Sequence, residues 1–218
     1  MKHAIAPEAG PAATESRWPA FVAMLGVIGV YMAVPDSLVV GPRWLHPTLL
    51  FVMLAGTVVS YRTGSHELNQ IFGHVLAGAI TFFMVVSLVL LVMAVPGNKE
   101  SPLGMVRSAS ALWITNVLVF AYWYWRLDGG GPYRRSLDPG HASRSFQFPQ
   151  MLMPGPPGAP AWSPEFIDYL FLSFNTSAAF SPTDTPVLSR WAKLLTMIQA
   201  SVSLTVVVVL VARAIGNV

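Results

Sequence analysis

From Ser65 to Val95 the chain reads SHELNQIFGHVLAGAITFFMVVSLVLLVMAV. Beyond Glu67 this stretch carries no Asp, Glu, Lys or Arg. It is longer than the about 20 apolar residues that an α-helix needs to cross the hydrocarbon core of a bilayer. Pro96 and Gly97 follow it, and such residues typically stop a helix. The stretch therefore predicts a membrane-spanning helix that crosses with some tilt.

The composition also indicates a membrane protein. Of 218 residues, 54% are hydrophobic and 11% are charged, whereas soluble domains carry about 25% charged residues. The net charge of +3 comes from Lys and Arg residues placed singly between apolar blocks, so no nucleic-acid partner is expected. The absence of cysteine excludes disulfides and thiolate nucleophiles. The lipid bilayer is the expected partner.

Further apolar blocks lie on both sides of this stretch. Together they predict spans at residues 18–31 (extending toward 40), 45–62, 65–95, 106–125 and 188–215. Trp123, Trp125 and Arg126 end the fourth span as an aromatic belt with a basic residue that reaches the interface. Asn116 within that span is expected to hydrogen bond to another helix. The predicted fold class is therefore all-α transmembrane, with about five spanning helices.

These spans divide the chain into four regions. Residues 1–17 are rich in Ala and Pro and are expected to form a disordered tail. Residues 18–126 form the predicted four-helix transmembrane region, and residues 127–162 form an exposed Gly/Pro-rich loop. Residues 163–218 make up a C-terminal module.

The C-terminal module begins with a helix that is too short to span. Ser163-Pro164-Glu165 is a helix start, and the apolar helix that follows runs from Phe166 to about Phe174. The next segment, residues 175–186, is small and polar with two prolines. Irregular backbone at membrane depth requires cover from protein or water, so the pattern predicts a re-entrant helix and loop before the last span. The alternative is an interfacial helix followed by a surface turn.

The residues from Tyr169 to Thr176, then Asp184, then Pro186-Val187 and the last helix resemble the pore module of potassium-channel-like proteins. The whole chain also resembles uncharacterised bacterial membrane proteins with the same modified loop. The resemblance implies a pore helix, a selectivity loop and an inner helix that assemble as a homotetramer around monovalent cations. It also implies a location in the bacterial inner membrane.

The selectivity loop departs from the family pattern. The filter positions fall on residues 179–183, with Asp184 in the place of the family's terminal aspartate, and both filter glycines are missing. Pro182 fixes φ near −65°, so a conventional potassium filter cannot form. Asp184 could instead cap the last helix. The expected constriction consists of Thr176, Ser177, Ala179, Phe180, Ser181, Pro182, Thr183 and Asp184.

The last helix carries a face of small and polar residues. Thr196, Gln199 and Ser203 are spaced so that they lie on one side of a helix. This face is expected either to line the pore or to pack against neighbouring helices, as small and polar residues do in membranes. No glycine lies between Trp191 and Ile215 to serve as a gating hinge.

A second candidate site lies in the long apolar stretch. Glu67, Gln70 and His74 recur at roughly helical spacing and could bind a proton or a cation. Alternatively, Glu67 and Gln70 reach lipid headgroups. His66-Glu67 begins a zinc motif, but Gln70 stands where the second histidine is required, so no metal site and no cofactor are expected.

The sequence thus predicts an ion-channel-like pore protein with a glycine-less selectivity loop. The alternatives are a non-conducting scaffold or sensor with the same fold, and a small proton-coupled transporter that uses Glu67 and His74. No enzyme is expected, since no nucleophile is paired with a base. A channel-like topology conflicts with the positive-inside rule, because it places most basic residues outside. These residues are Lys2, Arg17, Arg62, Arg126, Arg134, Arg135, Arg144, Arg190 and Lys193.

Overall fold

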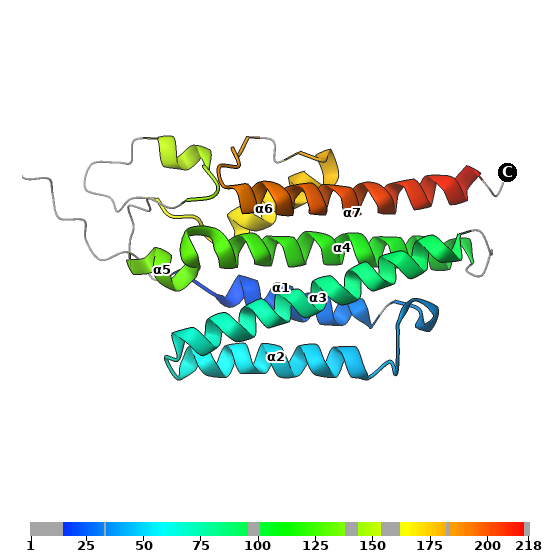
Figure 1. Cartoon of the computed structure of the whole chain (residues 1–218), viewed down its shortest axis with the longest axis horizontal. Coiled ribbons are helices and arrows are strands. Elements are labelled where there is room, and N and C mark those ends of the chain that lie inside the picture. Colours follow the sequence, from blue (N-terminus) through cyan, green and yellow to red (C-terminus); the bar gives the residue numbers. More distant parts are fainter. Residues whose placement is uncertain are drawn as a thin grey trace, which may run out of the picture.

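The computed structural model describes residues 15–32, 34–95, 101–137, 144–153, 162–181 and 184–215, and their regular structure is helical (Figure 1). Within these ranges the only β-type pairing is an isolated antiparallel bridge between Phe146 and Val187. The prediction of an all-α fold is confirmed. Residues 1–14 of the expected tail lie outside the described residues, as do Pro182 and Thr183 of the loop.

Three helices are long and apolar enough to cross a membrane. They are α3 (His66–Ala94), α4 (Pro102–Leu127) and α7 (Arg190–Ile215). Two further helices, α1 (Trp18–Tyr31) and α2 (Leu45–Arg62), lie beside them. The 14 residues of α1 extend for about 21 Å, which is shorter than the hydrocarbon core of about 30 Å.

Helix α4 is the centre of the bundle. It packs against α1, α3, α7 and the shorter helix α6 (Phe166–Ala179), while α2 packs mainly on α3. Small residues on α4, including Ser108 and Ala109, are fully buried and allow close approach of the neighbouring helices. The remaining short helices are Asp36–Leu38, Asp128–Gly130, α5 (Pro132–Leu137) and Pro149–Leu152.

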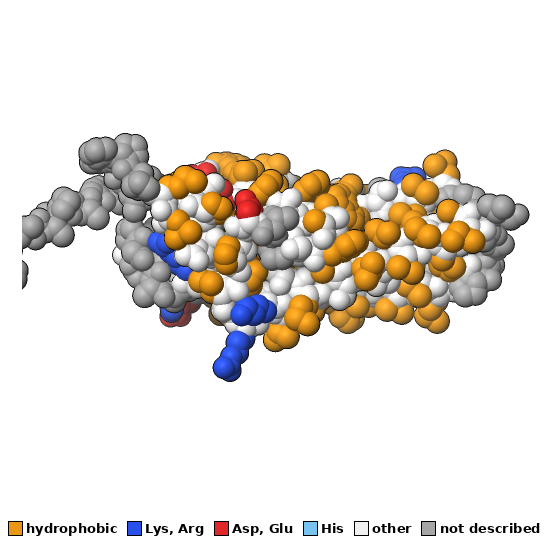
Figure 2. Space-filling model, turned by 90° about the horizontal axis from the view of Figure 1, so that it is seen from above, with side chains coloured by type: hydrophobic (Ala, Val, Ile, Leu, Met, Phe, Trp, Pro, Cys, Tyr) orange, Lys and Arg blue, Asp and Glu red, His pale blue; other side chains and the backbone are white. Residues whose placement is uncertain are grey.

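The outer surface is apolar along much of the bundle. Figure 2 shows hydrophobic side chains over the length of the visible face, with most of the charged side chains of that view toward the α5 end. Phe82 and Met93 of α3 and Met197 of α7 are each more than 60% exposed. Such side chains are costly to expose to water over a large contiguous area, so this surface supports a membrane protein.

The segment 127–162 differs from the exposed loop that its composition predicts. In its described part, α5 forms a short helix, and Asp128, Arg135 and Phe146 are almost fully buried. The reason is tertiary, because these side chains find partners on α4, on α6 and near the start of α1. The described part of the segment therefore forms a packed cover on one end of the bundle, called here the α5 end.

Candidate functional site

Helix α6 enters the bundle from the α5 end, and the chain then returns to that end. Near its start, the Tyr169 hydroxyl donates a hydrogen bond of 2.7 Å to the Asp128 carboxylate, just after α4. After α6, Val187 bridges Phe146, whose ring centroid lies 6.2 Å from that of Tyr169 and 5.9 Å from that of Trp191. Helix α7 therefore begins where α6 began, and both run in the same direction (Figure 1).

Local sequence explains both ends of α6. The Glu165 and Asp168 side chains form a capping box, in which the Glu165 N–H donates to Asp168 Oδ2 at 2.7 Å. At the other end Phe180 adopts a left-handed conformation with φ of 55°, which stops the helix. The structure extends α6 to Ala179, five residues beyond the sequence-based end at Phe174. Those residues continue the helix because Thr176 and Ser177 find buried partners.

A buried group of polar side chains joins α4, α6 and α7, and we call it the polar core. Gln199 of α7 donates to the Ser173 carbonyl at 2.8 Å and to the Ser177 hydroxyl at 2.7 Å. The Tyr124 hydroxyl of α4 donates to Gln199 Oε1. Asn116 Nδ2 donates to the Ser203 hydroxyl at 2.8 Å. The interhelical bond expected of Asn116 is thus confirmed, and Gln199 is the centre of the network.

The predicted constriction separates into two groups. Thr176 and Ser177 are buried within one chain, as are Thr196, Gln199 and Ser203 of the inner-helix face. Ala179, Phe180 and Ser181 are exposed at the end of α6, called here the tip, and Asp184 is exposed beside it. The polar core therefore consists of residues that hold α6 in place, whereas the exposed tip lies outside it.

The second candidate site is not assembled. Glu67 is exposed, and Gln70 donates to the Gly130 carbonyl at 3.0 Å. The His74 ring stacks on Trp123, with their centroids 6.0 Å apart, and its buried Nε2 has no hydrogen-bond partner. Among the described residues, no ion pair joins Glu67 to His74, and no group of three or more His, Asp and Glu side chains could hold a metal.

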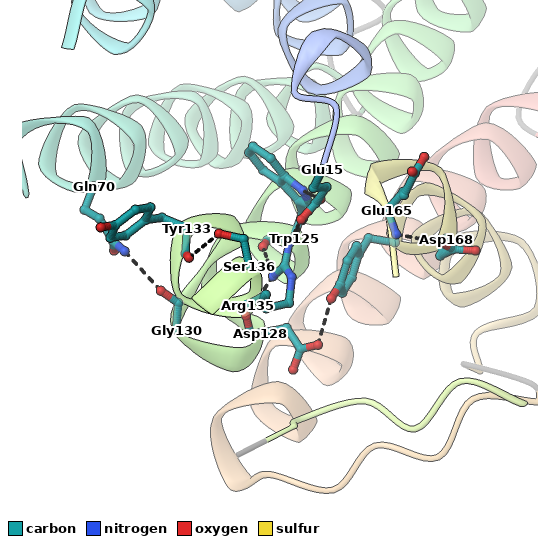
Figure 3. A network of polar contacts seen from close by, with 11 residues as sticks. Glu15, Gln70, Trp125, Asp128, Gly130, Tyr133, Arg135, Ser136, Glu165 and Asp168 are labelled. Carbon is teal, nitrogen blue, oxygen red and sulfur yellow. Dashed lines mark hydrogen bonds and ion pairs between the residues drawn. The ribbon is translucent and has the colours of Figure 1, made fainter. Parts of the chain in front are cut away.

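A cluster of charged side chains lies at the α5 end, and no local sequence pattern predicts it. Arg135 forms an ion pair of 3.0 Å with Glu15 and donates to the carbonyls of Trp125 and Asp128 at 2.7 Å each (Figure 3). Asp128 also accepts from the Ser145 N–H at 2.6 Å. These contacts connect the residues just before α1 with α5 and with the first turn of α6.

Arg126 does not reach the interface as its position in the aromatic belt predicts. Its side chain is 3% exposed and donates to Asn69 Oδ1 at 2.8 Å and to the Asn69 carbonyl. It lies directly against Gly73, where an added Cβ would be 1.6 Å from Arg126 Nη2. The glycine on α3 leaves the space that allows the guanidinium to turn inward.

No family model, curated protein or solved structure matches this chain. The resemblance to potassium-channel-like proteins therefore rests on the residues of the C-terminal module and stays a prediction.

Proposed function

We propose that this chain is an integral membrane protein of about five spans whose C-terminal module forms an ion-channel-like pore in a homo-oligomer. The observation that carries the proposal is the path of the chain around α6. Helix α6 enters the bundle from the α5 end and ends beside the polar core, and the chain then returns to the α5 end. One re-entrant segment cannot enclose a path alone, so several copies must meet, with a tetramer as the proposed state.

The exposed tip supplies the proposed constriction. Thr176, Ser177 and Gln199 hydrogen bond within one chain, so they hold the tip instead of lining the opening. The Asp184 carboxylate is exposed beside the tip and would attract monovalent cations as a ring of charges. Without the filter glycines, the pore is not a conventional potassium-selective one.

Replacing Asp184 by asparagine is expected to lower cation flux severalfold in liposomes that contain the purified oligomer, because the ring of carboxylates would lose its charge. The matched control is Asp36→Asn, which removes an exposed acid that pairs with Arg43 at 3.2 Å far from the tip. The control should conduct like the parent chain. A monomeric particle, or liposomes without flux of any monovalent cation, would remove this proposal.

A second candidate function is a non-conducting scaffold or sensor. Its support is the polar core, which fills the space between α4, α6 and α7 with hydrogen-bonded side chains. An oligomer that forms but passes no ion would favour this candidate. The proton-coupled transporter has less support, because the described residues include no ion pair between Glu67 and His74. It would require that Glu67→Gln abolish a pH-dependent transport activity.

The orientation proposed here reverses the channel-like topology. Helices α2 and α4 end at the α5 end, and helices α1, α6 and α7 begin there. Most of the basic residues lie at this end. Arg43, Arg107 and Arg213 lie on segments toward the other end. The positive-inside rule therefore favours the α5 end as cytoplasmic, in a bacterial inner membrane. Helix α6 would then enter from the cytoplasm.

Because the chain has no cysteine, single-cysteine variants can test this orientation. Leu137→Cys on α5 and Val40→Cys near the opposite end are both well exposed, at 67% and 59%. In spheroplasts with an intact inner membrane, a membrane-impermeant maleimide is expected to label Val40→Cys. Leu137→Cys is expected to stay unlabelled until the membrane is permeabilised. The reverse pattern would contradict the cytoplasmic placement of α5.

A further inference from the structure

A cavity of about 570 Å³ opens between α1 and α2 at the α5 end. Its rim carries Glu15, Arg17, Tyr61 and Arg62, and its deeper wall is formed by apolar side chains of both helices. This wall includes Phe21 and Leu25 of α1 and Phe51 and Leu54 of α2. One end of the cavity is thus charged and the other is apolar.

The depth of the cavity matches one leaflet of a bilayer. Along α1 the rise from Arg17 to Leu25 is about 12 Å, and along α2 the rise from Arg62 to Phe51 is about 16 Å. One leaflet contributes about 15 Å of hydrocarbon, half of the total core thickness. With the rim at the membrane surface, the apolar wall extends close to the middle of the bilayer.

The rim carries an excess of positive charge. Among the described residues that line the cavity, Glu15 is the only acidic one, and its carboxylate is already bound by Arg135 at 3.0 and 3.2 Å. Arg17 lies over the Tyr61 ring at 4.3 Å, and among the described residues neither Arg17 nor Arg62 forms an ion pair. Glu15 also attracts Arg17, but its carboxylate is bound by Arg135, so the guanidinium groups of Arg17 and Arg62 leave the rim with a net positive charge.

The groups behind the rim strengthen this field. Burial is the main cause that lowers the pKa of Arg17; Tyr61 and Glu15 oppose it, and the positive charges of Arg126 and Arg135 lower it further. Helix α1 begins at Trp18, which also lines the cavity, so the positive end of its dipole faces the same space. An anionic group at the rim would be stabilised by all of these charges.

We propose that this cavity binds an anionic phospholipid, with its phosphate at Arg17 and Arg62 and an acyl chain along the apolar wall between α1 and α2. Arginine is well suited to this role, because its planar guanidinium group binds phosphate oxygens in a bidentate manner. The acyl chain covers Phe21, Leu25, Phe51 and Leu54, which a water-soluble anion would leave uncovered. The occupant is therefore a lipid, and the site lies in the leaflet at the α5 end.

Native mass spectrometry of the purified full chain in neutral detergent tests the proposal. The probes are dioleoyl phosphatidylglycerol, dioleoyl phosphatidylcholine and inorganic phosphate. The parent chain is expected to retain phosphatidylglycerol about tenfold more than phosphatidylcholine, a difference of about 1.4 kcal/mol. Inorganic phosphate is expected to compete weakly with the lipid. Equal retention of the two lipids, or full displacement by inorganic phosphate, would overturn the proposal.

Variants separate the headgroup contact from the acyl contact. Arg17→Gln with Arg62→Gln should abolish the preference for the anionic lipid, and Arg62→Gln alone, at an exposed position, should reduce it. Ala55→Phe places a large ring in the cavity and should lower retention of both lipids. Arg43→Gln is the control, since Arg43 is an exposed arginine outside the cavity that pairs with Asp36. A loss of preference in Arg43→Gln equal to that in Arg62→Gln would contradict a defined site.

Discussion

Replacing Gly73 by alanine is expected to lower the free energy of unfolding by about 2 to 4 kcal/mol. An alanine Cβ at this position would lie 1.6 Å from Arg126 Nη2 and 2.1 Å from its Cζ, so the guanidinium would have to move. It would then lose its hydrogen bonds to Asn69, and each such bond to a charged group contributes about 1.5 to 3 kcal/mol. The better helix propensity of alanine offsets only about 1 kcal/mol of this loss.

Gly78→Ala on the same helix is the matched control. An added Cβ at Gly78 meets nothing within 4 Å, so this variant should keep or raise the stability of the parent chain by up to about 1 kcal/mol. Both variants can be compared by thermal unfolding in one detergent, followed by circular dichroism. If Gly73→Ala were as stable as Gly78→Ala, Arg126 would not occupy the place against α3 that the structure gives it.

The parts of the fold that the sequence predicts well are those determined by local pattern. The apolar run from Ser65 to Val95 predicts α3 to within one residue at each end, because an unbroken apolar run followed by Pro96 and Gly97 leaves few alternatives. The start of α6 at Phe166 is likewise marked by its cap residues. The length of an apolar stretch and the helix-capping residues depend only on a few turns of local sequence, so both can be recognised from the sequence.

The parts that the sequence does not predict depend on contacts between distant residues. Arg135 is buried because Glu15 lies beside it, a pairing across 120 positions that no local pattern reveals. Arg126 turns inward because Gly73 of α3 leaves room for it. Ser173 and Tyr124 join the polar core through hydrogen bonds with Gln199. The residues next to them in the sequence indicate only that each lies on an apolar helix.

The same distinction applies to the predicted pore residues. Helical spacing correctly places Thr196, Gln199 and Ser203 on one face of α7, and the structure buries all three. Spacing alone does not tell whether such a face meets water or another helix. The partners that decide this, Asn116 on α4 and Ser177 on α6, come from other parts of the chain.

Replacing Gln199 by leucine is expected to cost about 2 to 4 kcal/mol of stability, because several buried groups would lose a partner together. The Ser173 carbonyl and the Ser177 hydroxyl would lose the Gln199 amide as donor, and the Tyr124 hydroxyl would lose its acceptor. Leucine is similar in size, so the loss reports on hydrogen bonding more than on volume. Because these bonds connect α6 to α4 and α7, helix α6 should also become more accessible to proteolysis near its tip.

Thr205→Val on the same helix is the control for Gln199→Leu. Thr205 is half-buried and donates only to the Ser201 carbonyl of its own helix, so its replacement should change stability by less than about 0.5 kcal/mol. A double variant with Ser177→Ala should lose less than the sum of the two single losses, since both residues belong to one network. Strictly additive losses, or a Gln199→Leu variant as stable as Thr205→Val, would show that the polar core does not hold α6 in the bundle.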